Sequence, residues 1–364
     1  MGHDVFVVAD QELSEERRAL GWPVPKFGAA RVLVTRDQIA ISDVIKDLGK
    51  DTIHVVVGVR DSVNGYTALK TCIRQGVRIG FMSEAAQWHG LLGHVRRMVH
   101  VKDRLRFGGR FDFVLAMGQN GVDWFRSCGY PSEKLFLYGY AAEDPGVPLP
   151  SQGSEHVRPS EVVFIGRFLR CKGVPLLLRA LSECADLDWH LTFIGDGPQN
   201  IPWQEMASGL AVGHRVQFRA PLPHAEAMRL LADADLLVLP SETPEGWGVV
   251  VNEALMLGVP VVCTTVCGAK DLVCNDWLGS VVANGSVDAL RAALRRWISS
   301  STRDDMARSR IRSWSDHISG ERMAQYLVDV LCHVYGRARR PRPPWSELES
   351  DSVSRCQSGL CQTG

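Results

Sequence analysis

Short apolar runs alternate with longer amphipathic segments along most of the chain. In the first part, the runs predict strands at residues 4–9, 31–34, 53–57, 77–82, 111–116 and 135–138. Segments with helical spacing lie between most of these runs, for example over residues 62–75. Strands that alternate with helices predict a parallel, doubly wound sheet.

A second alternating series follows a stretch rich in Pro, Ser and Gly at residues 145–159. Its apolar runs predict strands at residues 161–165, 190–194, 215–218, 236–239 and 259–263. We therefore expect one α/β domain over residues 1–148, a linker at 149–159, and a second α/β domain over residues 160–318.

The end of the chain has two parts. We expect residues 319–336 to form a helix that crosses back to the first domain. Residues 337–364 are basic and proline-rich, then polar, and we expect them to be disordered.

Composition narrows the class of protein. A chain of 364 residues is long enough for two domains, and its 41 Lys and Arg balance its 41 Asp and Glu. This balance gives no support to nucleic-acid binding, and we predict none. The ten Cys are scattered, which is typical of reduced intracellular thiols. Cys263 and Cys267 have no His at metal-ligand spacing, so we predict no metal site.

The sequence shows no signal peptide and no apolar run long enough to span a bilayer. We therefore expect a cytoplasmic protein, either free or bound to the inner face of the membrane.

Residues 236–257 read as a buried strand, a tight loop and a helix. Gly258 and Pro260 end that helix. Glu245 lies in the loop and Glu253 in the helix, and the glycines near Glu245 let the backbone approach a ligand. On spacing alone, the two glutamates fit either a ligand site or a solvated carboxylate with a helix cap.

Further loop motifs follow predicted strands of the second domain, at the carboxyl edge where α/β sheets bind ligands. They are Gly166-Arg167, Lys172-Gly173, Gly195-Asp196-Gly197-Pro198, Glu245-Gly-Trp-Gly-Val-Val-Val-Asn-Glu253 and Gly258-Val259-Pro260. In identity, order and spacing this set resembles the retaining glycosyltransferases of family four, glycosyl transferases group 1. The resemblance implies the GT-B fold, in which two Rossmann-like doubly wound domains face a cleft.

The resemblance implies transfer of a hexose from a nucleotide diphosphate sugar to an acceptor hydroxyl, with retained configuration and without a metal or other cofactor. It implies that Glu253 binds the donor ribose and Glu245 the donor sugar. The implied donor site comprises Gly166, Arg167, Lys172, Gly197, Glu245, Gly246, Trp247, Gly248, Val249 and Glu253.

Arg167 and Lys172 suit this chemistry because negative charge grows on the departing diphosphate. The alternative interpretation is that both are ordinary surface charges. Two carboxylates also fit a glycoside hydrolase, but the accompanying cations favour a phosphate-bearing donor.

The first domain resembles the family less. Glu84 and His89 follow a predicted strand and are candidates for contact with the donor sugar or the acceptor. A helix-capping carboxylate and a surface imidazole remain the alternative.

Basic and apolar residues are interleaved at 94–110. Such a helix can lie on an anionic membrane, which would suit a polyprenyl-linked or other lipid-linked acceptor as well as a free saccharide. A solvated helix packed on its own domain is the alternative.

The chain departs from the family at its beginning, because its first strand looks like the family's second. We therefore expect the first βα unit to be missing, which leaves open a non-catalytic nucleotide-sugar-binding protein. A sugar-nucleotide epimerase of the same fold is another alternative. The favoured interpretation is a hexosyltransferase of bacterial cell-surface polysaccharide synthesis.

Overall fold

The computed structural model describes most of the chain. The described residues are 3–19, 21–22, 24–58, 63–86, 90–148, 158–300 and 305–346.

The described strands of the first half pair in parallel and form two separate sheets. They are β1 (Phe6–Ala9), β2 (Arg31–Val34), β3 (Ile53–Val57), β4 (Arg78–Ser83), β5 (Phe113–Met117) and β6 (Leu135–Tyr138). Among the described residues, β1 and β2 pair only with each other, and the other four strands form a sheet in sequence order. The helices are α1 (Glu15–Ala19), α2 (Gln38–Leu48), α3 (Val63–Gln75), α4 (Gly90–Phe107) and α5 (Gly118–Ser127).

The parallel pairing agrees with the sequence pattern, but the division into two sheets does not. The side chains of β1 and β2 bury little apolar surface, since Val8, Val32 and Val34 are 39%, 38% and 42% exposed. In contrast, every side chain of β5 is buried and apolar. Burial of apolar surface is the main force that brings strands into one core, and it is weak for the first two strands.

The second half has one six-stranded parallel sheet. Its strands are β7 (Ser160–Ile165), β8 (Trp189–Ile194), β9 (Val216–Arg219), β10 (Leu236–Leu239), β11 (Val261–Thr264) and β12 (Gly279–Val282). Their order is β12-β11-β10-β7-β8-β9. The chain thus builds outward from β7 in one direction, then crosses to β10 and builds in the other. This is the doubly wound order, and its switch point lies between β7 and β10.

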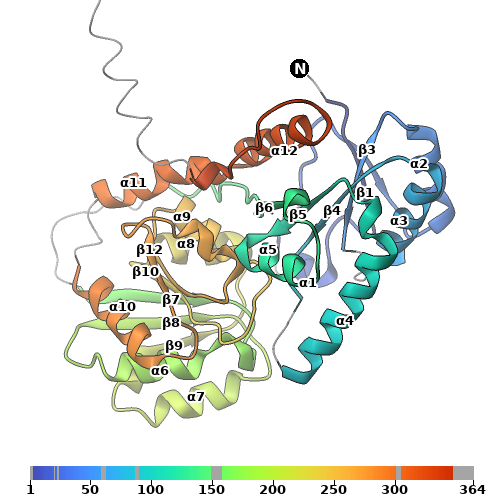
Figure 1. Ribbon diagram of the computed structural model, residues 1–364. Helices are drawn as coiled ribbons and strands as arrows, with labels where there is room; N and C mark the ends of the chain where they lie inside the picture. The colour runs from blue at the N-terminus through green and yellow to red at the C-terminus, as the bar shows by residue number, and fades with distance from the viewer. Residues whose placement is uncertain are drawn as a thin grey trace, which may run out of the picture.

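Helices cover both faces of this sheet, with α6, α7 and α10 on one face and α8 and α9 on the other (Figure 1). Their bounds are α6 (Val174–Ser182), α7 (Asn200–Ser208), α8 (His224–Asp233), α9 (Val250–Met256), α10 (Val287–Ser299), α11 (Asp305–Trp314) and α12 (Gly320–Tyr335).

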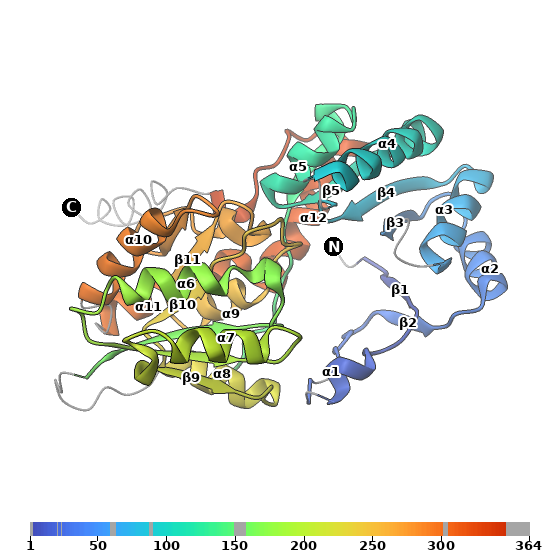
Figure 2. The same cartoon turned by 90° about the horizontal axis from the view of Figure 1, so that it is seen from below.

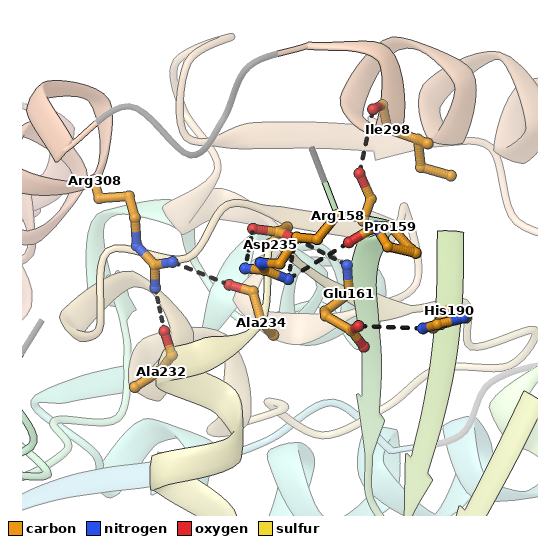
Figure 3. Close-up of polar contacts among 10 residues, drawn as sticks. Arg158, Pro159, Glu161, His190, Ala232, Ala234, Asp235, Ile298 and Arg308 are labelled. Carbon is orange, nitrogen blue, oxygen red and sulfur yellow. Dashed lines mark hydrogen bonds and ion pairs between the residues drawn. The ribbon is translucent and has the colours of Figure 1, made fainter. Parts of the chain in front are cut away.

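The amino ends of β7 and β10 are tied together by buried polar contacts (Figure 3). Asp235, just before β10, accepts a 2.9 Å hydrogen bond from the backbone N–H of Glu161 and pairs with Arg158. Arg308 of α11 donates to the carbonyl oxygens of Ala232 and Ala234, where α8 ends. Buried charged side chains need polar partners. Here the polar contacts join the strands on either side of the switch point.

Helix α12 packs against the first half. Tyr326 donates a 3.0 Å hydrogen bond to the carbonyl oxygen of Leu137, and Tyr138 donates one of 3.1 Å to that of Met323. Tyr335 donates to the carboxylate of Asp112 at 2.8 Å. Helix α12 therefore joins the two halves at β5 and β6.

We expected disorder from residue 337 onward, but residues 337–346 pack against the folded protein. The guanidinium of Arg340 lies 4.3 Å from the ring centroid of Phe136, and Trp345 is only 3% exposed. The cation–π contact holds Arg340 on the first half, and Trp345 packs where the two halves meet, near Gly139 and Cys274. The rest of the expected tail, and residues 149–157 of the expected linker, lie outside the described residues.

Candidate functional site: the switch point of the second sheet

The loops after β7 and β10 touch at the switch point. Gly173 has φ +67°, in the left-handed region, and a Cβ there would overlap the carbonyl group of Pro240. Similarly, Gly197 lies against the backbone of Phe168. Only glycine allows these backbone segments to approach so closely. The glycines of the predicted motifs therefore bring the loop ends together.

Lys172 and Glu245 form an ion pair across the two loops. The ammonium group contacts Oε1 of Glu245, and each side chain is only 15% exposed. Ser241 donates a 2.6 Å hydrogen bond to Oε2 of the same carboxylate, and Thr264 of β11 anchors the carbonyl oxygen of Ser241 at 2.7 Å. The structure thus joins two residues that the sequence places 73 positions apart.

Arg167 follows β7 directly and lies at the same edge of the sheet. Its side chain is exposed, while the next residue, Phe168, is fully buried and anchors the loop.

Glu253 projects from α9 and is 8% exposed. Nε2 of His224, the first residue of α8, lies 2.9 Å from Oε1 of Glu253. The His224 ring in turn lies 4.2 Å from the ring of Trp22, which comes from the first half. No sequence motif points to either residue. The available signal for His224 is its position at the start of a helix that follows a strand, at the same sheet edge as the predicted motifs.

The Trp247 side chain belongs to the packing between the halves. It is 2% exposed, and its Nε1 donates a 2.7 Å hydrogen bond to Asn252. The Asn252 amide donates to the carbonyl oxygen of Tyr140, and the Trp247 ring lies against Gly139. Only the backbone of this residue remains for contact with a ligand. The next residue, Gly248, has φ +89° and keeps the loop in a left-handed turn, and Val249 precedes α9.

Glu84 of the first half reaches the loop that carries Glu245. Its carboxylate accepts a 2.7 Å hydrogen bond from Tyr140 and lies against the α-carbon of Gly246, where a Cβ would overlap it. Glu84 also lines a cavity of about 250 Å³ in the first half, together with Met82, His100 and Asp103. His89, the other predicted residue of this region, lies outside the described residues.

A second bridge between the halves lies beside the site. The backbone N–H of Gln119, in α5, donates a 2.5 Å hydrogen bond to Asp271, and Lys270 donates to Asn120 at 2.9 Å. Burial raises the pKa of the Asp271 carboxyl above its ordinary value. No local motif marks these residues, because each partner comes from the other half.

Within the described parts of the chain, no group of three or more His, Cys, Asp or Glu side chains is arranged to hold a metal ion. In those same parts, no helix is both long and apolar enough to cross a bilayer. The switch point itself offers cationic and anionic side chains beside closely packed glycine loops. This arrangement can bind the anionic part and the hydroxyl groups of one ligand.

Residues 151–314 match the family described as Glycosyl transferases group 1, and this range holds Lys172, Glu245 and Glu253. This part of the chain is therefore similar to the glycosyl transferases group 1. The switch-point loops just described lie within the matched residues.

Two curated relatives match parts of the chain. One is the GDP-mannose-dependent alpha-(1-6)-phosphatidylinositol monomannoside mannosyltransferase of Mycolicibacterium smegmatis, 36% identical over 141 residues, which are 36% of this chain and 37% of the relative. The other is D-inositol 3-phosphate glycosyltransferase 1 of Catenulispora acidiphila, 33% identical over 234 residues, 56% of this chain and 54% of the relative. The chain thus spans about half or less of their lengths.

Solved structures match more of the chain. HepE of Anabaena in complex with UDP-glucose has a TM-score of 0.65 at 15% identity, over 90% of this chain and 91% of HepE. The lipopolysaccharide outer core galactosyltransferase WaaB has a TM-score of 0.63 at 17% identity, over 84% of each chain. The two halves of the chain together therefore have the GT-B fold.

Proposed function

We propose that this protein is a retaining glycosyltransferase that moves a hexose from a nucleotide diphosphate sugar to an acceptor hydroxyl. The observation that carries the proposal is the Lys172–Glu245 pair at the switch point, with the Glu253 carboxylate on the adjoining helix. The named donors and bound molecules of the relatives, GDP-mannose and UDP-glucose, support a nucleotide-sugar donor.

In the proposed reaction, the bond between the anomeric carbon and the diphosphate oxygen breaks, and the acceptor oxygen bonds to the anomeric carbon on the same face of the sugar. The proton of the acceptor hydroxyl passes to the departing diphosphate. Negative charge grows on the diphosphate as it leaves. Lys172 and Arg167 stabilise that charge more strongly in the transition state than in the ground state, which is what accelerates a reaction. We assign this role to these cations rather than to a metal ion.

Glu245 orients the donor sugar in this proposal. Its carboxylate already accepts bonds from Lys172 and Ser241, so it is fixed in position before a sugar hydroxyl donates to it. Glu253 binds the ribose hydroxyls. Gly166, Gly197, Gly246 and Gly248, with the backbone near Trp247 and Val249, allow the close approach of the diphosphate and sugar.

The acceptor site is proposed to lie in the first half, where Glu84 and Tyr140 line the cavity of about 250 Å³. Glu84 lies next to Gly246, so an acceptor hydroxyl bound there would be close to the donor sugar. Names of relatives such as the phosphatidylinositol mannoside enzyme support a saccharide or lipid-linked acceptor, in bacterial glycolipid or polysaccharide synthesis.

We also propose that α4 rests on the inner face of an anionic membrane. Val95, Met98 and Leu105 are 56%, 73% and 72% exposed and recur at spacings of three and seven residues, which is one helix face. Arginines at positions 96 and 106 and Lys102 are exposed on the same helix. Exposed apolar side chains with basic neighbours suit an anionic bilayer surface.

Calorimetric titration with UDP, GDP, ADP and their common sugars tests the donor site. We expect one nucleotide to bind, and Glu253→Ala to abolish most of that binding. Glu205→Ala, a change at an exposed residue of α7 that the proposal does not place in the donor site, serves as the control. No binding of any nucleotide by the wild type would refute the proposal.

Product analysis then separates transfer from the alternatives. A transferase releases free nucleotide faster when an acceptor is present, and an epimerase changes the sugar while it stays on the nucleotide. A protein that only binds donor gives neither product with any acceptor.

Co-sedimentation with vesicles tests the membrane proposal. We expect binding to vesicles that contain phosphatidylglycerol, weakened by salt and by Met98→Glu or Leu105→Glu. Met306→Glu is a matched control, because Met306 is 79% exposed but lies on α11. Vesicle binding that is unchanged by salt, by lipid charge and by the α4 variants would refute the membrane proposal.

A further inference from the structure

Trp22, His224 and Glu253 form a chain of contacts from the first half to the proposed ribose site. The rings of Trp22 and His224 lie 4.2 Å apart with an interplanar angle of 40°, and His224 lies 2.9 Å from Glu253. The guanidinium of Arg17 is 5.2 Å from the Trp22 ring centroid. The position beside the ribose-binding carboxylate is therefore aromatic, and one of its two rings comes from the other half.

The backbone before Trp22 also touches the second half. Gly21 has φ +67°, and a Cβ there would lie 3.5 Å from Cβ of Pro223, in ordinary contact. Figure 2 shows α1 beside the part of the second half that carries α8. The contact thus involves both the ring and the turn that presents it.

The segment that carries Trp22 is set apart from the main sheet of the first half. β1 and β2 pair only with each other among the described strands. Asn64 of α3 ties the segment down, with hydrogen bonds to Asp10 at 2.5 Å and to the carbonyl oxygen of Thr35 at 2.9 Å. A strand pair with its own sheet can shift relative to the rest of the half without breaking the ladder of β3 to β6.

We propose that Trp22 and His224 hold the nucleobase of the donor, with the base stacked between the two rings after the β1–α1–β2 segment shifts outward. This inference rests on the proposed function, because it takes Glu253 as the ribose-binding residue. A ribose held by Glu253 brings its base to the neighbouring position, which is where His224 and Trp22 lie.

Stacking on aromatic rings depends little on which base is present, because every base has a π-face. Trp22 would therefore strengthen binding of nucleotides in general. The same shift would couple donor binding to the position of the first half, since Trp22 belongs to that half and His224 to the other.

The test compares nucleotide and pyrophosphate binding by the full chain. The variants are Trp22→Ala, Trp22→Phe and the control Val24→Ala, which changes an exposed residue of the same segment. We expect Trp22→Ala to weaken binding of the preferred nucleoside diphosphate by about five- to a hundredfold and to leave pyrophosphate binding, measured by competition, unchanged. Trp22→Phe should keep most of the affinity, and Val24→Ala all of it.

Fluorescence gives a second readout. Nucleotide binding should quench part of the tryptophan emission, and that part should disappear in Trp22→Phe.

Each other outcome overturns the inference. Unchanged or tighter nucleotide binding by Trp22→Ala would mean that the ring does not hold the base. An equal loss of nucleotide and pyrophosphate binding would mean that Trp22 only supports the fold. If the wild type binds no nucleotide, the proposed function fails together with this inference. If the wild type and Trp22→Ala bind nucleotide equally well, only this inference is refuted.

Discussion

The carboxylate of Glu84 lies directly against Gly246, although the two residues belong to different halves of the protein. Tyr140 holds that carboxylate with a 2.7 Å hydrogen bond. The loop between Glu245 and Trp247 can pass Glu84 only because residue 246 has no side chain. The proposed acceptor side and the proposed donor side therefore meet at a glycine.

We expect Gly246→Ala to reduce transfer at least tenfold, because the new methyl group overlaps the Glu84 carboxylate and moves the loop that carries Glu245. Steady-state kinetics with the donor found by calorimetry would measure this loss. Because the displaced loop carries donor-site residues, Gly246→Ala should also weaken nucleotide binding, and the double variant Glu84→Ala/Gly246→Ala, which relieves the overlap, should recover that affinity. Gly109→Ala is the control, since open space surrounds Gly109. Wild-type kinetics for Gly246→Ala would contradict the described contact.

The Lys172–Glu245 pair should contribute to both stability and rate. Lys172→Met leaves a largely buried carboxylate without its cation, which costs about 1–3 kcal/mol of the free energy of unfolding. It should also lower the transfer rate by about a hundredfold or more, as loss of one charge-stabilising group does in other enzymes.

Urea unfolding of Lys172→Met, Glu245→Gln and the double variant measures the coupling between the two residues. We expect the double variant to lose less stability than the two single variants together. Lys46→Met serves as the control, because its pair with Asp43 is about half exposed and should contribute under about 1 kcal/mol. Strict additivity at positions 172 and 245 would rule out the pair.

Trp247→Phe should destabilise the contact between the halves. The phenyl ring fills most of the space but cannot donate to Asn252, which is fully buried, and an unpaired buried acceptor costs about 1–3 kcal/mol. Chemical unfolding measures this loss, and transfer should fall as well. Trp297→Phe removes a similar 2.9 Å hydrogen bond to Ser280 away from the site, and should cost stability but not activity. Equal effects of both variants on transfer would argue against a positioning role for Trp247.

Asp271 should make stability depend on pH in the acidic range. Burial raises the pKa of its carboxyl in the folded protein above the ordinary value of 3.8. At a pH between these two pKa values, the folded protein keeps a proton that the unfolded chain has lost. This contribution to stability is fully present below the unfolded pKa and is lost as pH rises through the folded pKa.

The variant Asp271→Asn has no proton to lose. The free energy of unfolding of the wild type minus that of Asp271→Asn should therefore fall as pH rises above about 4 and then level off. Urea unfolding between about pH 4 and pH 7 measures the difference, with Asp43→Asn as an exposed control. A difference that rises with pH would mean that the pKa is lowered in the folded protein.

Most strands of the second half, and the motifs of its loops, could be predicted from the amino-acid sequence. Apolar runs predicted strands close to β7, β8, β9, β10 and β11, because buried parallel strands consist almost entirely of apolar residues. Gly173 belongs to a motif that was named from its resemblance to the family, and the structure explains the residue because only glycine allows the backbone to approach Pro240 so closely. Each of these signals is local, lying within a few residues of the position it describes.

The contacts between the two halves could not be predicted from the sequence. Trp22 reaches His224, Glu84 reaches Gly246, and Gln119 reaches Asp271, each over a long stretch of chain. A contact of this kind depends on how two folded units pack, and leaves no spacing or periodicity in either segment. The separate sheet of β1 and β2 also could not be predicted from the sequence, because the pairing of strands depends on the surface that each strand buries.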